Sequence, residues 1–294
     1  MSSVEEKEKP VILVRDYSKY SKSLLNQLKG VQKYIKEADA IASAIESLGH
    51  NIIRTNIWPR NFFYSEPGKI IVKEDPFSLF PLADNVFGNS GLFLSSETTL
   101  LVSTYAFDPH DYRLEQRAEV LGLEKQIIRF NVAPMPFGRI NYPGLDTDNR
   151  SLRDIDFVAN WIFDEGVLFT YDFLLETNEK SLAQLRNVGV DKLVLLPEDE
   201  FKYFAVNFGV FEIDNKYHLV VNSRCSKTID LLRAEGFNVT STKKPLDSLD
   251  YVKYSQSKSG PGGGVRCCTN ELYRSSLEGL KDQALVVLGV YNKL

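Results

Sequence analysis

Cysteine, histidine and tryptophan are scarce: the 294 residues include three cysteines, three histidines and two tryptophans. An odd number of cysteines does not suit a disulfide framework, and adjacent residues such as Cys267 and Cys268 rarely bridge each other. No apolar stretch approaches the roughly 20 residues that are needed to cross a bilayer. The N-terminal stretch MSSVEEKEKP also lacks the apolar core of a signal peptide. We therefore expect a cytoplasmic protein without a membrane partner.

An excess of positive charge is absent as well. Lysine and arginine together number 35, and aspartate and glutamate 39, which gives a net charge of -4. Nucleic-acid-binding proteins carry a basic patch or stripe, so we exclude nucleic acid as a partner. With 43% hydrophobic and 25% charged residues, the composition is that of an ordinary globular protein. We expect a small-molecule substrate, no cofactor and no metal, and leave the oligomeric state open, with a homodimer as one option.

Hydrophobic periodicity predicts short strands that alternate with helices. Apolar residues recur at three- and four-residue steps from Leu24 to Leu48 and predict a helix that Gly49 ends. Further helices are expected over residues 111–123, 179–189 and 226–236. Strands are expected over residues 11–15, 51–59, 69–74, 91–96, 99–104, 125–132, 154–163, 166–171, 192–197, 203–213, 217–222, 238–242 and 284–292.

The order of these elements is repetitive. Two segments, which begin at residues 154 and 203, each run strand, strand, helix and strand. Each covers about 50 residues, a period that indicates repeated supersecondary units. No low-complexity linker interrupts the series. We therefore predict an α/β chain of repeated ββαβ units, which forms one domain over residues 1–294 with a flexible tail at 1–10.

The stretch SGPGGGVRCCTNEL, residues 259–272, places two of the three cysteines directly behind a glycine-rich loop. Glycine lets the backbone approach a ligand closely and point N–H groups at a sulfur atom. Arg266 adds a positive charge, and a cysteine needs such a field to form a thiolate at neutral pH. Because side chains alternate along a strand, only one of Cys267 and Cys268 is expected to face a site. In the structural alternative, both are small buried side chains beside a turn.

Residues 204–272 resemble the last two repeats of the guanidine-modifying, or pentein, superfamily. The similarity is carried by AVN at 205–207, LVVN at 219–222, SKTIDLLRAEGFNV at 226–239 and GGGVRCCTNEL at 262–272. Weaker matches lie at residues 58–63, 89–104 and 153–171. The superfamily includes arginine deiminase, agmatine deiminase, dimethylarginine dimethylaminohydrolase and the amidinotransferases. The resemblance implies a five-bladed αβ propeller with its active site in a central channel.

The resemblance also implies an activity and assigns roles to residues. In the superfamily, the cysteine that follows the glycines is the nucleophile, and Cys267 holds that position. This implies a cysteine-dependent amidinohydrolase or amidinotransferase that acts on a guanidino- or ureido-bearing small molecule. The expected catalytic residues are Cys267 and Asp154, and the expected substrate-binding residues are Asp156, Asn61, Arg60, Asn89, Gly264 and Arg266.

Three positions depart from the superfamily pattern. Asp154 stands where the histidine general acid–base is expected, while Asp156 keeps the acid of that motif. Asn61 and Asn89 stand where the first and second repeats carry acids. Two neighbouring carboxyls raise the pKa of one of them, so Asp154 can replace the histidine as general acid–base. Among the histidines, His110 is the one placed in a loop from which it could reach a site.

These departures leave a second hypothesis open. A catalytically degenerate pentein that acts as a ligand-binding or interaction protein would keep the fold and lose the acids and the histidine. The glycine loop does not distinguish an active enzyme from a degenerate one, because glycines also persist where the backbone conformation requires them. The sequence also does not choose between hydrolysis of the amidino group and its transfer to an acceptor.

Overall fold

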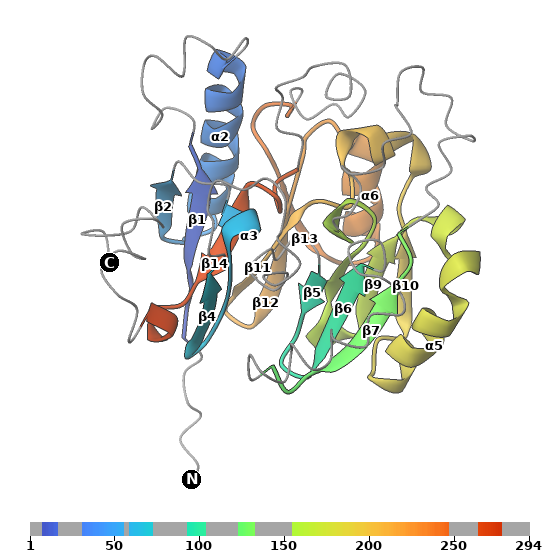
Figure 1. Cartoon of the computed structure of the whole chain (residues 1–294). Coiled ribbons are helices and arrows are strands. Elements are labelled where there is room, and N and C mark those ends of the chain that lie inside the picture. Colours follow the sequence, from blue (N-terminus) through green and yellow to red (C-terminus); the bar gives the residue numbers. More distant parts are fainter. Residues whose placement is uncertain are drawn as a thin grey trace. The chain divides into compact units, whose positions relative to one another are not determined.

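The computed structural model describes residues 8–16, 31–55, 59–72, 93–103, 123–132, 155–246 and 264–277 (Figure 1). The chain divides into two compact units. Unit 1 comprises Met1–Asn89 and Cys268–Leu294, and unit 2 comprises Ser90–Cys267. Within the described ranges, none of the helices combines the length and the apolar character needed to cross a membrane.

The larger sheet of unit 1 pairs segments that lie far apart in the sequence (Figure 1). Its strand order is β14 (Thr269–Leu272), β1 (Val11–Arg15) and β2 (Ile52–Thr55). The central strand β1 is antiparallel to β14 and parallel to β2. The helix α2 (Val31–Glu46) lies between the two parallel strands in the sequence and packs against both. After α2, Gly49 adopts a left-handed φ of 86°, which confirms the predicted helix end.

A hairpin forms the second described sheet of unit 1. The short helix α3 (Pro59–Phe62) leads into β3 (Phe63–Glu66), which pairs antiparallel with β4 (Lys69–Val72). The sequence predicted β4 and missed β3, because half of the segment FYSE is polar and its alternation is too short to recognise. The two sheets share buried apolar side chains, which include Val11, Leu13, Ile53, Phe63 and Leu272.

The described part of unit 2 contains three sheets of one topology. Their strand orders are β5 (Phe93–Ser95), β6 (Thr99–Ser103), β7 (Gln126–Phe130); β8 (Asn160–Ile162), β9 (Val167–Thr170), β10 (Lys192–Leu195); and β11 (Gly209–Ile213), β12 (Lys216–Val221), β13 (Asn238–Ser241). In each sheet the first pair is antiparallel and the second pair is parallel. The helices α5 (Glu179–Asn187) and α6 (Ser226–Ala234) provide two of the parallel crossovers. The predicted ββαβ units are therefore confirmed, and their arrangement as five blades stays a prediction.

Two expected strands are shorter than predicted. The segment 154–163 forms the 3-10 helix η4 (Ile155–Phe157) before the three-residue strand β8. The segment 203–213 begins at the end of the 3-10 helix η8 (Glu198–Tyr203), and β11 starts only at Gly209. In both segments, turn geometry that depends on tertiary hydrogen bonds replaces the first half of the expected strand.

The cysteine pair lies in a turn and not on a strand. The expectation that only one of the two side chains faces a site assumed the alternation of a strand, so its basis is wrong. Residues 265–268 form the turn, and β14 begins after it at Thr269. Cys267 and Cys268 are both buried, with exposed fractions of 3% and 8%. The helix expected over residues 111–123 is described only at its last residue, and the strand expected over 284–292 lies outside the described residues.

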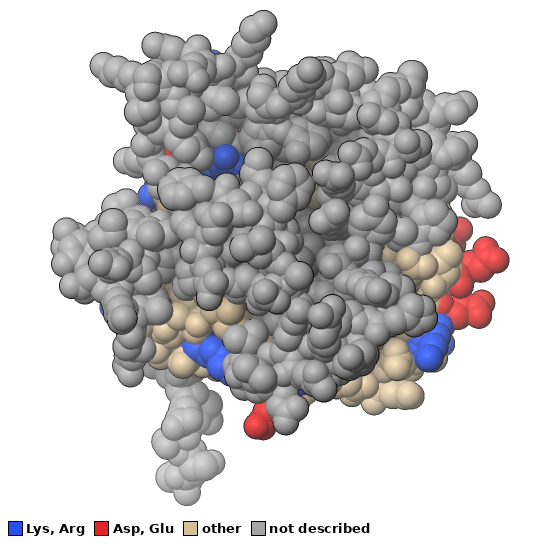
Figure 2. All heavy atoms as spheres, in the orientation of Figure 1, with Lys and Arg blue, Asp and Glu red and all other residues tan. Residues whose placement is uncertain are grey.

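Charged side chains of both signs lie next to each other on the molecular surface. On the face drawn in Figure 2, described lysine and arginine side chains and described acidic side chains meet at the right-hand edge. Among the described residues of this face, basic side chains do not form a continuous stripe.

Candidate active site around Cys267

The structure brings together four of the predicted site residues in unit 2. These are Asp156 in η4, Gly264 directly before the turn that leads to β14, and Arg266 and Cys267 in that turn. Arg60 and Asn61 belong to α3 in unit 1. Asp154 and Asn89 lie outside the described residues. Their expected roles therefore stay predictions.

A thiol and a carboxylate are in direct contact at the centre of this group. Cys267 Sγ donates to Asp156 Oδ2 at 3.3 Å. Asp156 is fully buried, and Cys267 is 3% exposed. A carboxylate removed from water interacts strongly with neighbouring charges and donors, because the local dielectric is low. Such a carboxylate can hold a cationic group next to the sulfur atom.

Asn207 is a residue of the site that the sequence did not predict. Its carboxamide Nδ2 lies 3.0 Å from Cys267 Sγ and donates to the backbone oxygen of Asp156 at 2.8 Å. Its Oδ1 accepts the backbone N–H of Cys267 at 3.0 Å. One side chain therefore touches the backbone of both Cys267 and Asp156 as well as the thiol. The sequence signal for Asn207 is the segment AVN at 205–207, which is one of the matches to the superfamily.

The loop that carries Asn207 is held by hydrogen bonds from two buried side chains. The hydroxyl of Tyr171 accepts the backbone N–H of Val206 at 3.2 Å. Asn160 Nδ2 donates to the oxygens of Val206 and Phe208 at 3.1 and 2.9 Å. Burial raises the pKa of Tyr171 well above its usual value, so its hydroxyl keeps its proton at neutral pH. The loop is thus fixed from the β8–β9 sheet before any ligand binds.

Arg266 and Gly264 support this loop from the other side. The backbone N–H of Arg266 donates to Asn207 O at 3.1 Å, and its Nη1 donates to Asn160 Oδ1 at 3.3 Å. A Cβ atom at Gly264 would lie 2.5 Å from Asn207 O and 2.8 Å from Asn207 Oδ1. Glycine is therefore required at position 264 by close packing against Asn207, an explanation that the sequence did not provide.

Cys225, the third cysteine, is chemically unlike Cys267. It is fully buried at the start of α6, and its thiol lies 3.7 Å from Tyr203 O. Burial, and next the nearby carboxylate of Glu200, raise its pKa far above the ordinary value of a thiol. Cys225 is therefore a protonated thiol at neutral pH. It is not a candidate nucleophile.

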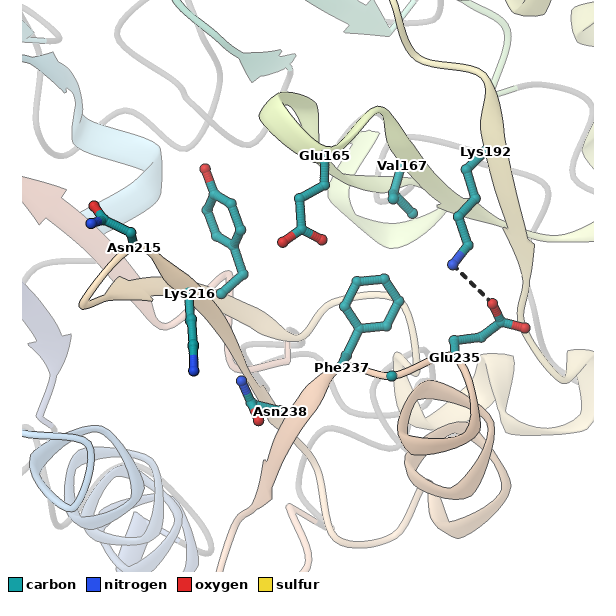
Figure 3. A pocket seen from close by; sticks show the side chains of 10 residues that line it. Glu165, Val167, Lys192, Asn215, Lys216, Glu235, Phe237 and Asn238 are labelled. Carbon is teal, nitrogen blue, oxygen red and sulfur yellow. Dashed lines mark ion pairs between the residues drawn. The ribbon is translucent and has the colours of Figure 1, made fainter.

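A cavity of about 450 Å³ lies elsewhere in unit 2, and Figure 3 shows the side chains that line it. Its lining includes Glu165, Tyr217 and Phe237, together with an ion pair of 3.0 Å between Lys192 Nζ and Glu235 Oε2. These residues lie at or next to the starts of the parallel strands β9, β10, β12 and β13. Asn160, in contrast, pairs with the end of β9. The cavity therefore lies at the opposite edge of the sheets from the Cys267 site.

Sequence comparisons give no relatives: neither a family model nor a curated protein matches the chain. Among the described residues, no group of three or more His, Cys, Asp or Glu side chains could hold a metal ion.

Although the sequence comparisons find no match, the structure of the chain does match solved structures.

One match is an arginine dihydrolase from the ornithine–ammonia cycle in cyanobacteria, with 14% identity and a TM-score of 0.55. The match covers 92% of this chain but only 40% of the dihydrolase. A dimethylarginine dimethylaminohydrolase from Pseudomonas aeruginosa matches over 90% of this chain and 100% of its own, with 12% identity and a TM-score of 0.52.

An amidinotransferase from Microseira wollei in the saxitoxin biosynthetic pathway also matches. It has 11% identity and a TM-score of 0.56, and the match covers 91% of this chain and 95% of the transferase. All three are amidino-modifying enzymes of the guanidine-modifying superfamily. The resemblance is therefore confirmed at the level of the fold.

Proposed function

We propose that the chain is a cysteine-dependent amidinohydrolase or amidinotransferase that acts on a guanidino- or ureido-bearing small molecule. The observation that carries the proposal is the 3.3 Å contact between Cys267 Sγ and the buried Asp156 carboxylate. A nucleophile beside a buried carboxylate is the pair that attack on a guanidinium carbon requires. The fold, which amidino-modifying enzymes share, supports the same chemistry.

In the proposed reaction, Asp156 accepts N–H groups of the substrate in place of the thiol proton. Asp154 takes the proton of Cys267, and the thiolate attacks the planar amidino carbon to form a C–S bond. Asp154 returns the proton to the nitrogen of the leaving amine as the C–N bond breaks. Water, or an acceptor amine in a transferase, then attacks the carbon, gives a proton to Asp154 and releases the thiolate.

The remaining predicted residues are assigned to substrate binding. Asparagine at positions 61 and 89 offers an amide where the superfamily has acids, so the site grips a cation less strongly. An amide can bond a ureido group, which favours a substrate with less positive charge than arginine. The proposed substrate-binding residues are Asp156, Asn61, Arg60, Asn89, Gly264 and Arg266.

A covalent adduct on Cys267 is the expected result when the protein meets its substrate. The test is mass spectrometry of the intact, acid-quenched protein after incubation with arginine, agmatine, and methylated or acylated guanidines. We expect a mass increase that peptide mapping places on Cys267, because the C–S intermediate survives quenching. An adduct on another residue, or turnover of a guanidine without an adduct on Cys267, would contradict the covalent mechanism.

The general acid–base role of Asp154 predicts a further result. Residue 154 directly precedes η4, which carries Asp156, so the two carboxyls are two residues apart in the chain. Asp154→Asn keeps the size of the side chain and removes its proton, so we expect turnover to fall about 100-fold, the usual contribution of a general acid–base. Steady-state assays of amine or ammonia release measure the effect. Unchanged turnover in the folded variant would show that another group moves the proton.

The departures from the superfamily pattern favour one alternative, a ligand-binding or interaction protein without turnover. Under that hypothesis the wild-type protein binds a guanidine in calorimetry but releases no amine from it. Asp154→His then distinguishes the two hypotheses. Activity gained by this variant, in the absence of wild-type activity, would indicate a degenerate site.

A further inference from the structure

We infer that Asn207 positions the Cys267 thiol for attack and stabilises its thiolate by donating an N–H to the sulfur atom. The inference deepens the proposed function and rests on the nucleophilic role of Cys267. It is carried by the contacts of one carboxamide, which include the sulfur atom at 3.0 Å and the backbone of Cys267 and Asp156.

The contacts of the carboxamide fix its orientation. Oδ1 faces the backbone N–H of Cys267, which can only donate, and Nδ2 faces the backbone oxygen of Asp156, which can only accept. Turning the amide by 180° would place donor against donor and acceptor against acceptor. Nδ2 must therefore face Cys267 Sγ. The second N–H of Nδ2 remains for the sulfur atom, because the first is used by Asp156 O.

Comparison with equivalent asparagines shows that Asn207 departs from the common pattern of the repeats. Asn160 and Asn270 each use Oδ1 to accept the N–H of the next residue. Each uses Nδ2 to donate to backbone oxygens of a distant segment. For Asn160 these are the oxygens of Val206 and Phe208. Asn270 donates in the same way to Phe63 O at 2.8 Å. These two asparagines have a structural role, whereas the carboxamide of Asn207 is directed at the candidate nucleophile.

The backbone around Asn207 is built to hold this orientation. Phe204, three residues earlier, has a left-handed φ of 56°, which is uncommon for a bulky residue. Backbone strain of this kind persists where the surroundings enforce it, and here Asn207 N–H bonds back to Phe204 O at 2.9 Å. On the opposite side, Gly264 packs so closely that a Cβ atom there would lie 2.5 Å from Asn207 O and 2.8 Å from Asn207 Oδ1. The donor is therefore in place before the sulfur atom becomes charged.

A preorganised N–H donor favours the charged form of the group that it faces. Asp156 acts in the opposite direction, because its negative charge disfavours a second negative charge nearby. Asn207 thus offsets part of the effect of Asp156 and keeps the sulfur atom usable as a nucleophile at neutral pH.

The test measures alkylation of Cys267 by iodoacetamide as a function of pH, because thiolate is the reactive form. Asn207→Asp replaces the donor by an oxygen of the same size. We expect the rate at pH 7 to fall by about tenfold or more, since one hydrogen bond to a charged group is lost and a carboxylate takes its place beside the sulfur atom. We also expect the midpoint of the pH profile to rise by about one unit. Peptide mapping separates Cys267 from Cys225 and Cys268.

Asn270→Asp is the matched control, because it makes the same substitution at an equivalent position that does not touch a thiol. Its alkylation profile is expected to coincide with that of the wild-type protein. Circular dichroism and thermal melting establish that each variant is folded. Should Asn207→Asp not fold, Asn207→Ser, whose hydroxyl is too short to reach the sulfur atom, replaces it and should shift the profile in the same direction.

A folded Asn207 variant with the wild-type pH profile would overturn the inference, whatever the outcome of turnover assays. A shifted profile in the Asn270 variant as well would overturn it too, because the effect would then be structural. Alkylation needs no turnover, so the result is independent of the proposed function. Failure to detect an adduct or product would count against that function alone.

Discussion

Replacing Cys267 with alanine is expected to abolish amidino chemistry, with turnover reduced by about 10⁴-fold or more. Losses of this size follow from removal of a covalent nucleophile, because the remaining groups of a site give only a small residual rate. Alanine also removes the thiol that contacts Asp156 Oδ2, and therefore leaves the carboxylate and Asn207 in place without a nucleophile. Substrate binding should persist. Calorimetry and product assays on the same preparation separate binding from turnover.

Cys268→Ala is the matched control for this experiment. It makes the same substitution at the adjacent residue, whose backbone oxygen accepts the N–H of Arg15 in unit 1. Because that contact involves the backbone, the alanine variant keeps it, and turnover should change by no more than a few-fold. A complete loss in Cys268→Ala together with normal turnover in Cys267→Ala would reverse the assignment of the two cysteines.

Asp156→Asn is expected to lower kcat/KM by about 1000-fold. Removing one partner of a buried charged pair costs about 3–5 kcal/mol, and each 1.36 kcal/mol corresponds to a factor of ten in rate. The substitution keeps the shape of a side chain that is fully buried, so the loss reflects charge and not packing. A guanidinium substrate should lose most, and a neutral ureido compound should lose less.

Alkylation by iodoacetamide should respond to Asp156→Asn in the opposite direction. Without the negative charge at 3.3 Å, the thiolate of Cys267 is favoured and the variant should react faster than the wild-type protein. Asp199→Asn is the control for the change in net charge, because Asp199 forms a surface ion pair with Lys227. Slower alkylation together with slower turnover would indicate that Asp156 only supports the fold.

Local patterns in the sequence predicted the regular elements of the fold well. The strand β1 coincides with the predicted residues 11–15, and α5 and α6 begin at the predicted residues 179 and 226. These elements follow from apolar periodicity within the segment itself. The sequence also predicted the order of hairpin, helix and parallel strand, because each element of the repeat has its own length and its own period of apolar residues.

The geometry of the site was less predictable, because it depends on contacts between distant segments. The apolar run before Asn207 is typical of a strand, yet Tyr171 and Asn160 hold that segment in a turn. Cys267 was predicted from the glycines that precede it. The role of Asn207 was not, since nothing local distinguishes it from Asn160, which has the same spacing to a preceding phenylalanine. Only the hydrogen-bond partners separate the two.

The pairing of β14 with β1 has a consequence for synthesis of the chain on the ribosome. The strand β1 is made early, but its antiparallel partner β14 is made only after all of unit 2. Until then, one edge of β1 exposes backbone groups that can pair with other chains. The sheets of unit 2 pair strands that are near neighbours in the sequence, and such contacts form quickly. Unit 2 can therefore fold first during translation, and the β14–β1–β2 sheet of unit 1 is completed only when Thr269–Leu272 leave the ribosome.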